Sequence, residues 1–234
     1  MHDFLVSTVN NRTLSFYLLF AVALLLTRIP LIGKYFRSVN TMIHESGHAL
    51  MTLLVSGEVI AVNLFADTSG NIVTKAKNKF LQVLIAIAGY PTSALCGFIF
   101  LLLLSKGYHL QILFVLVSLT LLLMMLSIRN AYGLFWAGTF TVINLLLIYF
   151  NDPLWIFIAA TFFSLIILVD SVISSFILLV ISIKTPKKSG DAANLEKFTG
   201  IPAVVWSILL LAFSGYMAYL SMTHYFPPFK GIIN

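Results

Sequence analysis

The stretch LWIFIAATFFSLIILVDSVISSFILLVISI, residues 154–183, has thirty residues, and Asp170 is the only charged one among them. An α-helix needs about 20 predominantly apolar residues to cross the hydrocarbon core of a bilayer. At 1.5 Å per residue this stretch would reach about 45 Å. It therefore predicts a membrane helix that is tilted, projects into water or breaks.

The rest of the chain has the same character. Of its 234 residues, 60% are hydrophobic and 9% are charged, and its mean hydropathy is +1.01, whereas soluble domains carry about 25% charged residues. The predicted spans lie near residues 14–28, 40–56, 80–105, 109–128, 131–150, 154–183 and 202–222. We predict an all-α polytopic membrane protein with six to seven transmembrane helices, embedded in a lipid bilayer as one domain over residues 1–234.

Basic residues lie mainly in the short connections between these spans. With seven spans, the basic residues divide between the two sides of the membrane as follows. One side holds Arg12, Lys75, Lys77, Lys79, Arg129, Lys184, Lys187, Lys188 and Lys197, and the other holds Arg28, Lys34, Arg37, Lys106 and Lys230. Because cytoplasmic loops carry an excess of Lys and Arg, the first side, with the N-terminus, is expected to be cytoplasmic. These topological charges account for the net charge of +6, so no nucleic-acid partner is expected.

Residues 57–79 differ in kind from the apolar spans. Residues 59–65 and 72–74 are β-prone, and residues 67–71 (DTSGN) between them have turn chemistry. We predict a β-hairpin after the second span. Open strand edges cannot face lipid, so it must lie at the surface, against protein or beside a water-filled cavity. A hydrophilic loop is expected at residues 184–200.

The sequence His44-Glu45-Ser46-Gly47-His48 lies inside the second predicted span. Two histidines four residues apart on a helix share one face and can hold the same metal ion. Glu45 follows the first histidine, where its carboxylate can take a proton from a metal-activated water. Ionisable residues within a membrane segment are costly and usually mark function. We therefore expect zinc bound by His44 and His48, with Glu45 as general base.

Zinc that keeps an open position for water needs a third protein ligand. The other histidines lie in the N-terminal tail or at predicted helix ends: His2, His109 and His224. Asp170 lies within a span, where a carboxylate must bind a metal, pair with a cation or be protonated. Span counting places His44 and Asp170 in helices that enter from the same side, with Asp191 on the opposite side. Asp170 is therefore the favoured third ligand, and Asp191 is the alternative.

Several motifs beyond the histidine pair point to a family. They are His44-Glu45-Ser46-Gly47-His48-Ala49-Leu50, Ser56-Gly57-Glu58-Val59, Ala88-Gly89-Tyr90 with Ser93 and Gly97, Ser189-Gly190-Asp191-Ala192, and Thr199-Gly200-Ile201-Pro202-Ala203 with Trp206. In this order they resemble site-2-protease-like intramembrane zinc metalloproteases, in particular the compact branch that lacks a PDZ or CBS domain. Better-known members take their third ligand from a Leu-Asp-Gly sequence in an Asn-Pro-rich context, which this chain lacks.

The resemblance implies a zinc metalloendopeptidase that hydrolyses a peptide bond in or near the transmembrane segment of another membrane protein. The hairpin could hold an unwound substrate by strand addition. The small size and the resemblance favour a bacterial cytoplasmic membrane. Two alternatives remain open: a transporter or ion pathway built on His44, Glu45 and His48, and a relative that binds membrane proteins without cleaving them.

Overall fold

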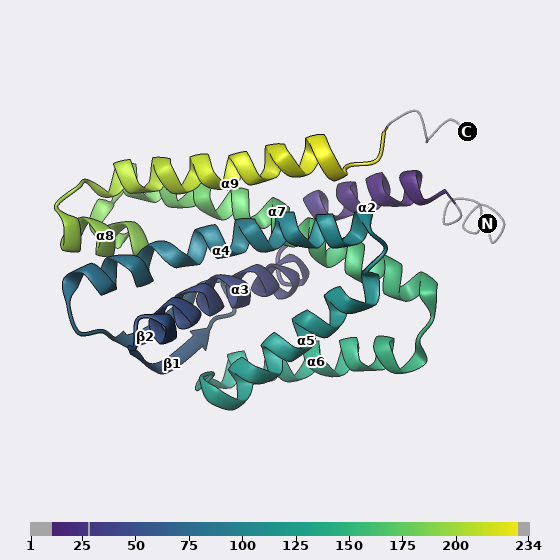
Figure 1. Cartoon of the computed structure of the whole chain (residues 1–234), viewed down its shortest axis with the longest axis horizontal. Helices are drawn as coiled ribbons and strands as arrows, with labels where there is room; N and C mark the ends of the chain where they lie inside the picture. The colour runs from purple at the N-terminus through teal and green to yellow at the C-terminus, as the bar shows by residue number, and fades with distance from the viewer. Residues whose placement is uncertain (1–10, 28, 229–234) are drawn as a thin grey trace.

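The chain folds as a bundle of long helices with one small β-hairpin (Figure 1). This computed structural model describes residues 11–27 and 29–228. The elements are α2 (Arg12–Leu26), α3 (Ile32–Leu54), β1 (Glu58–Leu64), β2 (Gly70–Lys75), α4 (Lys79–Ser105), α5 (His109–Leu126), α6 (Ala131–Phe150), α7 (Pro153–Lys184), η1 (Pro186–Lys188), α8 (Asp191–Thr199) and α9 (Ala203–Tyr225). The predicted all-α polytopic membrane fold with a β-hairpin is confirmed. That residues 1–234 form one domain stays a prediction.

Five helices in the described part of the chain are long and apolar enough to cross a membrane, namely α4, α5, α6, α7 and α9. They correspond closely to the last five predicted spans. Helix α7 is one continuous helix of 32 residues, so the long apolar stretch does not break. The Asp152 side chain accepts the Leu154 and Trp155 N–H groups at its start. Pro153 occupies the first turn, where its missing N–H costs nothing.

The first two predicted spans were wrong in their arrangement. Helix α2 has 15 residues, which is about 22 Å of helix and too short to cross a bilayer alone. Helix α3 has 23 residues and begins at Ile32, well before the predicted start near residue 40. The chain does not reverse between them, because α3 continues from α2 in the direction of the hairpin (Figure 1).

Contacts with α7 support the same arrangement. Arg12 at the start of α2 lies over the ring of Phe157 near the start of α7. Arg37 in α3 binds Asp170, further along α7. Helices α2 and α3 therefore form one traverse that runs parallel to α7. The described residues make six traverses rather than seven, and the start of α2 lies at the same end of the molecule as the end of α9.

The hairpin is antiparallel, with a register that places Val62 opposite Ile72. The connection between α5 and α6 covers the outer edge of β1. The Val62 N–H donates to the Ser127 carbonyl at 2.8 Å, and the Asn130 side chain bonds to both backbone groups of Leu64. Within the described residues β2 has β1 as its one strand partner, and its residues Gly70, Asn71, Ile72 and Thr74 line a cavity. The hairpin thus lies against protein and beside a cavity, two of the environments allowed for it.

The hydrophilic segment 184–200 contains more structure than the predicted loop. After the short 3-10 turn η1, α8 forms nine residues of helix. Gly190 and Gly200 flank α8 with φ angles of 53° and 78°, a region that glycine adopts at little cost. Ala192 and Leu195 are buried, and α8 packs against α4 and α9. Two buried apolar residues in nine are too few to signal a helix by periodicity.

The corrected traverse count changes the expected orientation. The hairpin end holds Lys75, Lys77, Lys79, Arg129, Lys184, Lys187, Lys188 and Lys197, whereas the other end holds Arg12 and Lys106. Of the other residues in the first count, Lys34 and Arg37 lie within α3, and Arg28 and Lys230 lie outside the described residues. The excess of positive charge at the hairpin end predicts that this end is cytoplasmic, and that α2 starts on the opposite face.

Single-cysteine labelling checks this orientation. Cys96 is the only cysteine in the chain, so a Cys96→Ser background can carry one new cysteine at Tyr108, between α4 and α5, or at Lys187, near α8. In intact cells a membrane-impermeant maleimide is expected to label position 108, and to label position 187 only after permeabilisation. The reverse pattern would contradict the six-traverse orientation.

Candidate metal centre

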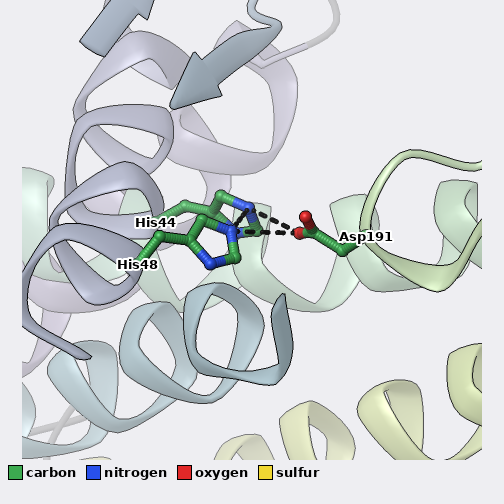
Figure 2. A group of neighbouring side chains, drawn as sticks. All are labelled: His44, His48 and Asp191. Atoms are coloured by element: carbon green, nitrogen blue, oxygen red, sulfur yellow. Dashed lines mark hydrogen bonds and ion pairs between the residues drawn. The ribbon is translucent and has the colours of Figure 1, made fainter. Parts of the chain in front are cut away.

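His44 and His48 lie one helical turn apart on the same face of α3 (Figure 2). Their ring centroids are 4.7 Å apart, and their Nε2 atoms are separated by 3.0 Å. The spacing of four residues produces this arrangement, because side chains four apart on a helix are neighbours. Both imidazoles therefore turn the same nitrogen toward one point.

Asp191 approaches that point from a different element. It is the first residue of α8, and its Oδ2 lies 3.1 Å from Nε2 of His44 and 3.1 Å from Nε2 of His48 (Figure 2). Burial alone would raise the pKa of Asp191, but the charge and hydrogen bonds of the two imidazoles lower it well below its usual range. Asp191 is thus held as the carboxylate, the form that ligates a metal.

The three donor atoms fit zinc. His44, His48 and Asp191 each offer one ligand atom, and these three atoms lie within 4.8 Å of one another. Ligands about 2.0–2.1 Å from a tetrahedral zinc are roughly 3.3 Å apart, close to the observed separations. Two imidazole nitrogens and one carboxylate oxygen also form a donor set found in catalytic zinc sites, which leave the fourth position open.

Contacts behind the rings orient them. The Nδ1–H of His48 donates to the Ile85 carbonyl of α4 at 2.6 Å. In the neutral imidazole this bond fixes the tautomer whose Nε2 carries the lone pair that a metal needs. Tyr90 packs edge-on against the His44 ring, with centroids 4.6 Å apart. A Cβ at Gly89 would lie 2.5 Å from ring atoms of both histidines, so only glycine lets α4 come this close.

Asp170, the favoured third ligand from the sequence, is engaged elsewhere. Its Oδ1 accepts the Arg37 Nε–H at 2.6 Å, and its Oδ2 accepts an N–H of Asn40 at 3.1 Å. The structure thus gives this buried carboxylate a cation partner and does not place it in the histidine group. Membrane depth had pointed away from Asp191 because a separate span starting near residue 40 put His44 close to the face opposite Asp191, whereas α3 begins at Ile32 and continues the traverse of α2. With one traverse, His44 and Asp191 lie toward the same face.

Glu45 lies beside the three ligands and is 4% exposed. With them it lines a cavity of about 730 Å³, bounded also by the hairpin turn, β2 and α7. Sequence reasoning missed Arg37 and Asn40 as cavity residues. Their spacing could have identified them, because Arg37 and Asn40 precede His44 by seven and four residues and so lie on the same face of the helix.

The fold and these side chains define a class: an integral membrane protein with a candidate metal centre between its helices. The family follows from comparison. The chain belongs to the Peptidase M50B-like family, whose model matches residues 17–221. The resemblance to site-2-protease-like proteins is thereby confirmed. At the family level the chain is an intramembrane metallopeptidase, and zinc is the metal of that family. No curated protein and no solved structure matches it.

The zinc content of two variants distinguishes Asp191 from Asp170 as the third ligand. Asp191→Asn is expected to weaken zinc binding by more than about 100-fold, because loss of even an outer-shell partner costs 10–100-fold. Asp170→Asn should keep one zinc per folded chain. It should lower stability by about 3 kcal/mol, the low end for breaking a buried ion pair, because Arg37 retains some solvent contact.

Elemental analysis and thermal unfolding of the purified variants in detergent measure both quantities. Zinc retained by Asp191→Asn and lost from Asp170→Asn would return Asp170 to the ligand set.

Proposed function

We propose that this chain is a zinc-dependent endopeptidase that cleaves transmembrane proteins within or near their membrane segments. The observation that carries the proposal is the convergence of His44, His48 and Asp191 beside the buried Glu45. His44, His48 and Asp191 are the proposed zinc ligands, and Glu45 is the proposed general base. The small size and the family support a bacterial cytoplasmic membrane as its location.

Each protein group has a defined task in this reaction. A zinc ion held by the three ligands would supply the Lewis acidity that activates water and polarises the scissile carbonyl. Glu45 would accept the proton of the attacking water and return it to the leaving amine. Because Glu45 is almost fully buried, its carboxylate acts in an environment of low dielectric, where electrostatic interactions are stronger than in water.

The substrate must present an unwound backbone to this centre. Helical peptide groups are hydrogen-bonded to one another, and exposing them in lipid costs several kcal/mol for each unsatisfied group. The cavity has a volume of about 730 Å³, which is enough for a short peptide segment. If the unwound substrate paired with the hairpin as an added strand, its own backbone N–H and C=O groups would find hydrogen-bond partners there.

The geometry of the hairpin selects the edge for strand addition. β1 already directs the backbone of Val62 toward the connection between α5 and α6. In an antiparallel ladder, two opposite residues that form no hydrogen bond with each other both direct their N–H and C=O groups away from each other and toward the outer edges. Ile72, opposite Val62, therefore points its N–H and C=O toward the free edge of β2. Ile72 and its neighbours in β2 line the cavity, so we place the substrate strand along the free edge of β2.

The family match supports this proposal over a transporter or ion pathway. A relative that binds membrane proteins without cleaving them would need no general base. The retained Glu45, buried next to the ligand group, supports an enzyme over such a binding protein.

Glu45→Gln tests the proposed chemistry. The amide keeps the shape of the side chain but cannot take a proton, so cleavage should fall by about 10²–10⁴-fold, while zinc stays at one per chain. The measurement is cleavage of single-span model proteins in proteoliposomes, with and without chelator. Unchanged cleavage by the zinc-loaded variant would refute the assignment of Glu45.

Ile72→Pro tests strand addition. Proline removes the outward N–H and is tolerated on a strand edge, so the hairpin should persist. We expect KM to rise about five- to tenfold, the effect of losing one hydrogen bond, with kcat little changed. Ile72→Val keeps the N–H and serves as the matched control. An unaltered KM in the proline variant would count against substrate binding along β2.

A further inference from the structure

The turn of the hairpin reaches the proposed general base. A Cβ built on Gly70, the first residue of β2, would lie 2.2 Å from Oε1 of Glu45 and 2.8 Å from both its Cδ and Cγ. These separations are too short for any real side chain. The φ angle of Gly70 is not positive, so its backbone conformation is open to other residues. The three atoms nearest to that Cβ all belong to Glu45, so a side chain at this position would have to displace the Glu45 side chain.

The turn itself is anchored on α3. The Thr41 hydroxyl donates to the Thr68 carbonyl at 2.9 Å, and Thr41 lies one helical turn before Glu45. Within the turn, the Ser69 N–H and hydroxyl donate to the Asp67 carboxylate at 3.0 Å and 2.6 Å. Thr68 has a φ of 71°, a strained conformation for a β-branched residue. Strain of this kind persists where surrounding contacts enforce it, and it clusters at functional sites.

The Glu45 side chain lines the cavity and lies against the hairpin turn. In the described part of the structure no hydrogen bond or ion pair to its carboxylate is formed, although the side chain is 4% exposed. Gly70 contributes a wall of backbone on one side of that carboxylate. The orientation of the base toward the metal centre therefore depends on where the hairpin turn lies.

We propose that Gly70 is a positioning residue for Glu45, so that the hairpin turn is a structural part of the catalytic centre. Gly70 also begins β2, the strand along which we place the substrate. A substrate strand that settles on β2 would thereby steady the wall against which the base rests. This inference depends on the proposed function, because it assigns to Gly70 an effect on the proton transfer by Glu45.

Gly70→Ala is the direct test. The new methyl group would displace the Glu45 carboxylate, and misplacement by about 1 Å costs up to about 100-fold in rate. We expect kcat to fall about 10- to 100-fold, KM to stay within about twofold, and zinc to remain at one per chain. Gly138→Ala is the matched control, since a Cβ there meets nothing within 4 Å, and it should behave as the unmodified protein.

Two further variants keep the test decisive if Gly70→Ala folds poorly. Glu45→Ala removes the Cγ, Cδ and Oε1 atoms that the added methyl group would meet. The fall in melting temperature caused by Gly70→Ala should therefore disappear in the Glu45→Ala background. Thr41→Val deletes the bond to Thr68 at nearly constant volume, and it should lower kcat about three- to tenfold without changing KM or zinc content.

The outcomes separate this inference from the proposed function. An unchanged kcat in Gly70→Ala, a raised KM with unchanged kcat, or a loss of zinc would each overturn the positioning role. A melting temperature lowered equally in both backgrounds would overturn the contact with Glu45. The proposed function fails separately, if the unmodified protein shows no chelator-sensitive cleavage.

Discussion

Helix α3 carries imidazoles, a carboxylate and a guanidinium through a region where ionisable groups without partners are costly. The imidazoles and the guanidinium are met by polar groups from other elements, and the carboxylate of Glu45 lines the cavity. Asp191 of α8 reaches both imidazoles, the Ile85 carbonyl of α4 takes the Nδ1–H of His48, and Asp170 of α7 takes Arg37. The packing of α4, α7 and α8 around α3 follows from this requirement. These polar and charged side chains form a polar stripe along α3, which is stable in a membrane only if the remaining helices enclose it.

The hairpin solves a related problem for its backbone. A two-stranded sheet has two open edges, and neither can face hydrocarbon. The connection at residues 127–130 pairs with β1, which leaves β2 as the edge that needs a polar environment. The cavity next to the proposed zinc ligands supplies it. The same cavity thus serves both the polar side chains of α3 and the free edge of β2. This explains why the hairpin lies beside the site.

Local chemistry in the sequence predicted much of this arrangement. Apolar length identified α4 to α7 and α9, and β-prone runs around DTSGN identified the hairpin. The four-residue spacing of His44 and His48 predicted their shared face, because a helix imposes it. The choice of Asp191 over Asp170 as the proposed third ligand could not be made in this way. Asp191 can reach the histidines only if His44 lies deep in its traverse, toward the end where α8 begins, and that depth depended on whether the chain reverses between α2 and α3. Neither segment carries a local signal for that choice.

The origin of Asp191 outside the long helices has an energetic consequence. His44 and His48 belong to α3, whose position is set by extensive packing against α4 and α7. Asp191 belongs to a nine-residue helix that buries only Ala192 and Leu195, so α8 has a small apolar contact of its own. A metal ion shared by α3 and α8 would join the weakly packed element to the strongly packed one. Because metal binding free energy contributes to folding when it holds separate elements together, the docking of α8 and the occupancy of the centre are expected to be coupled.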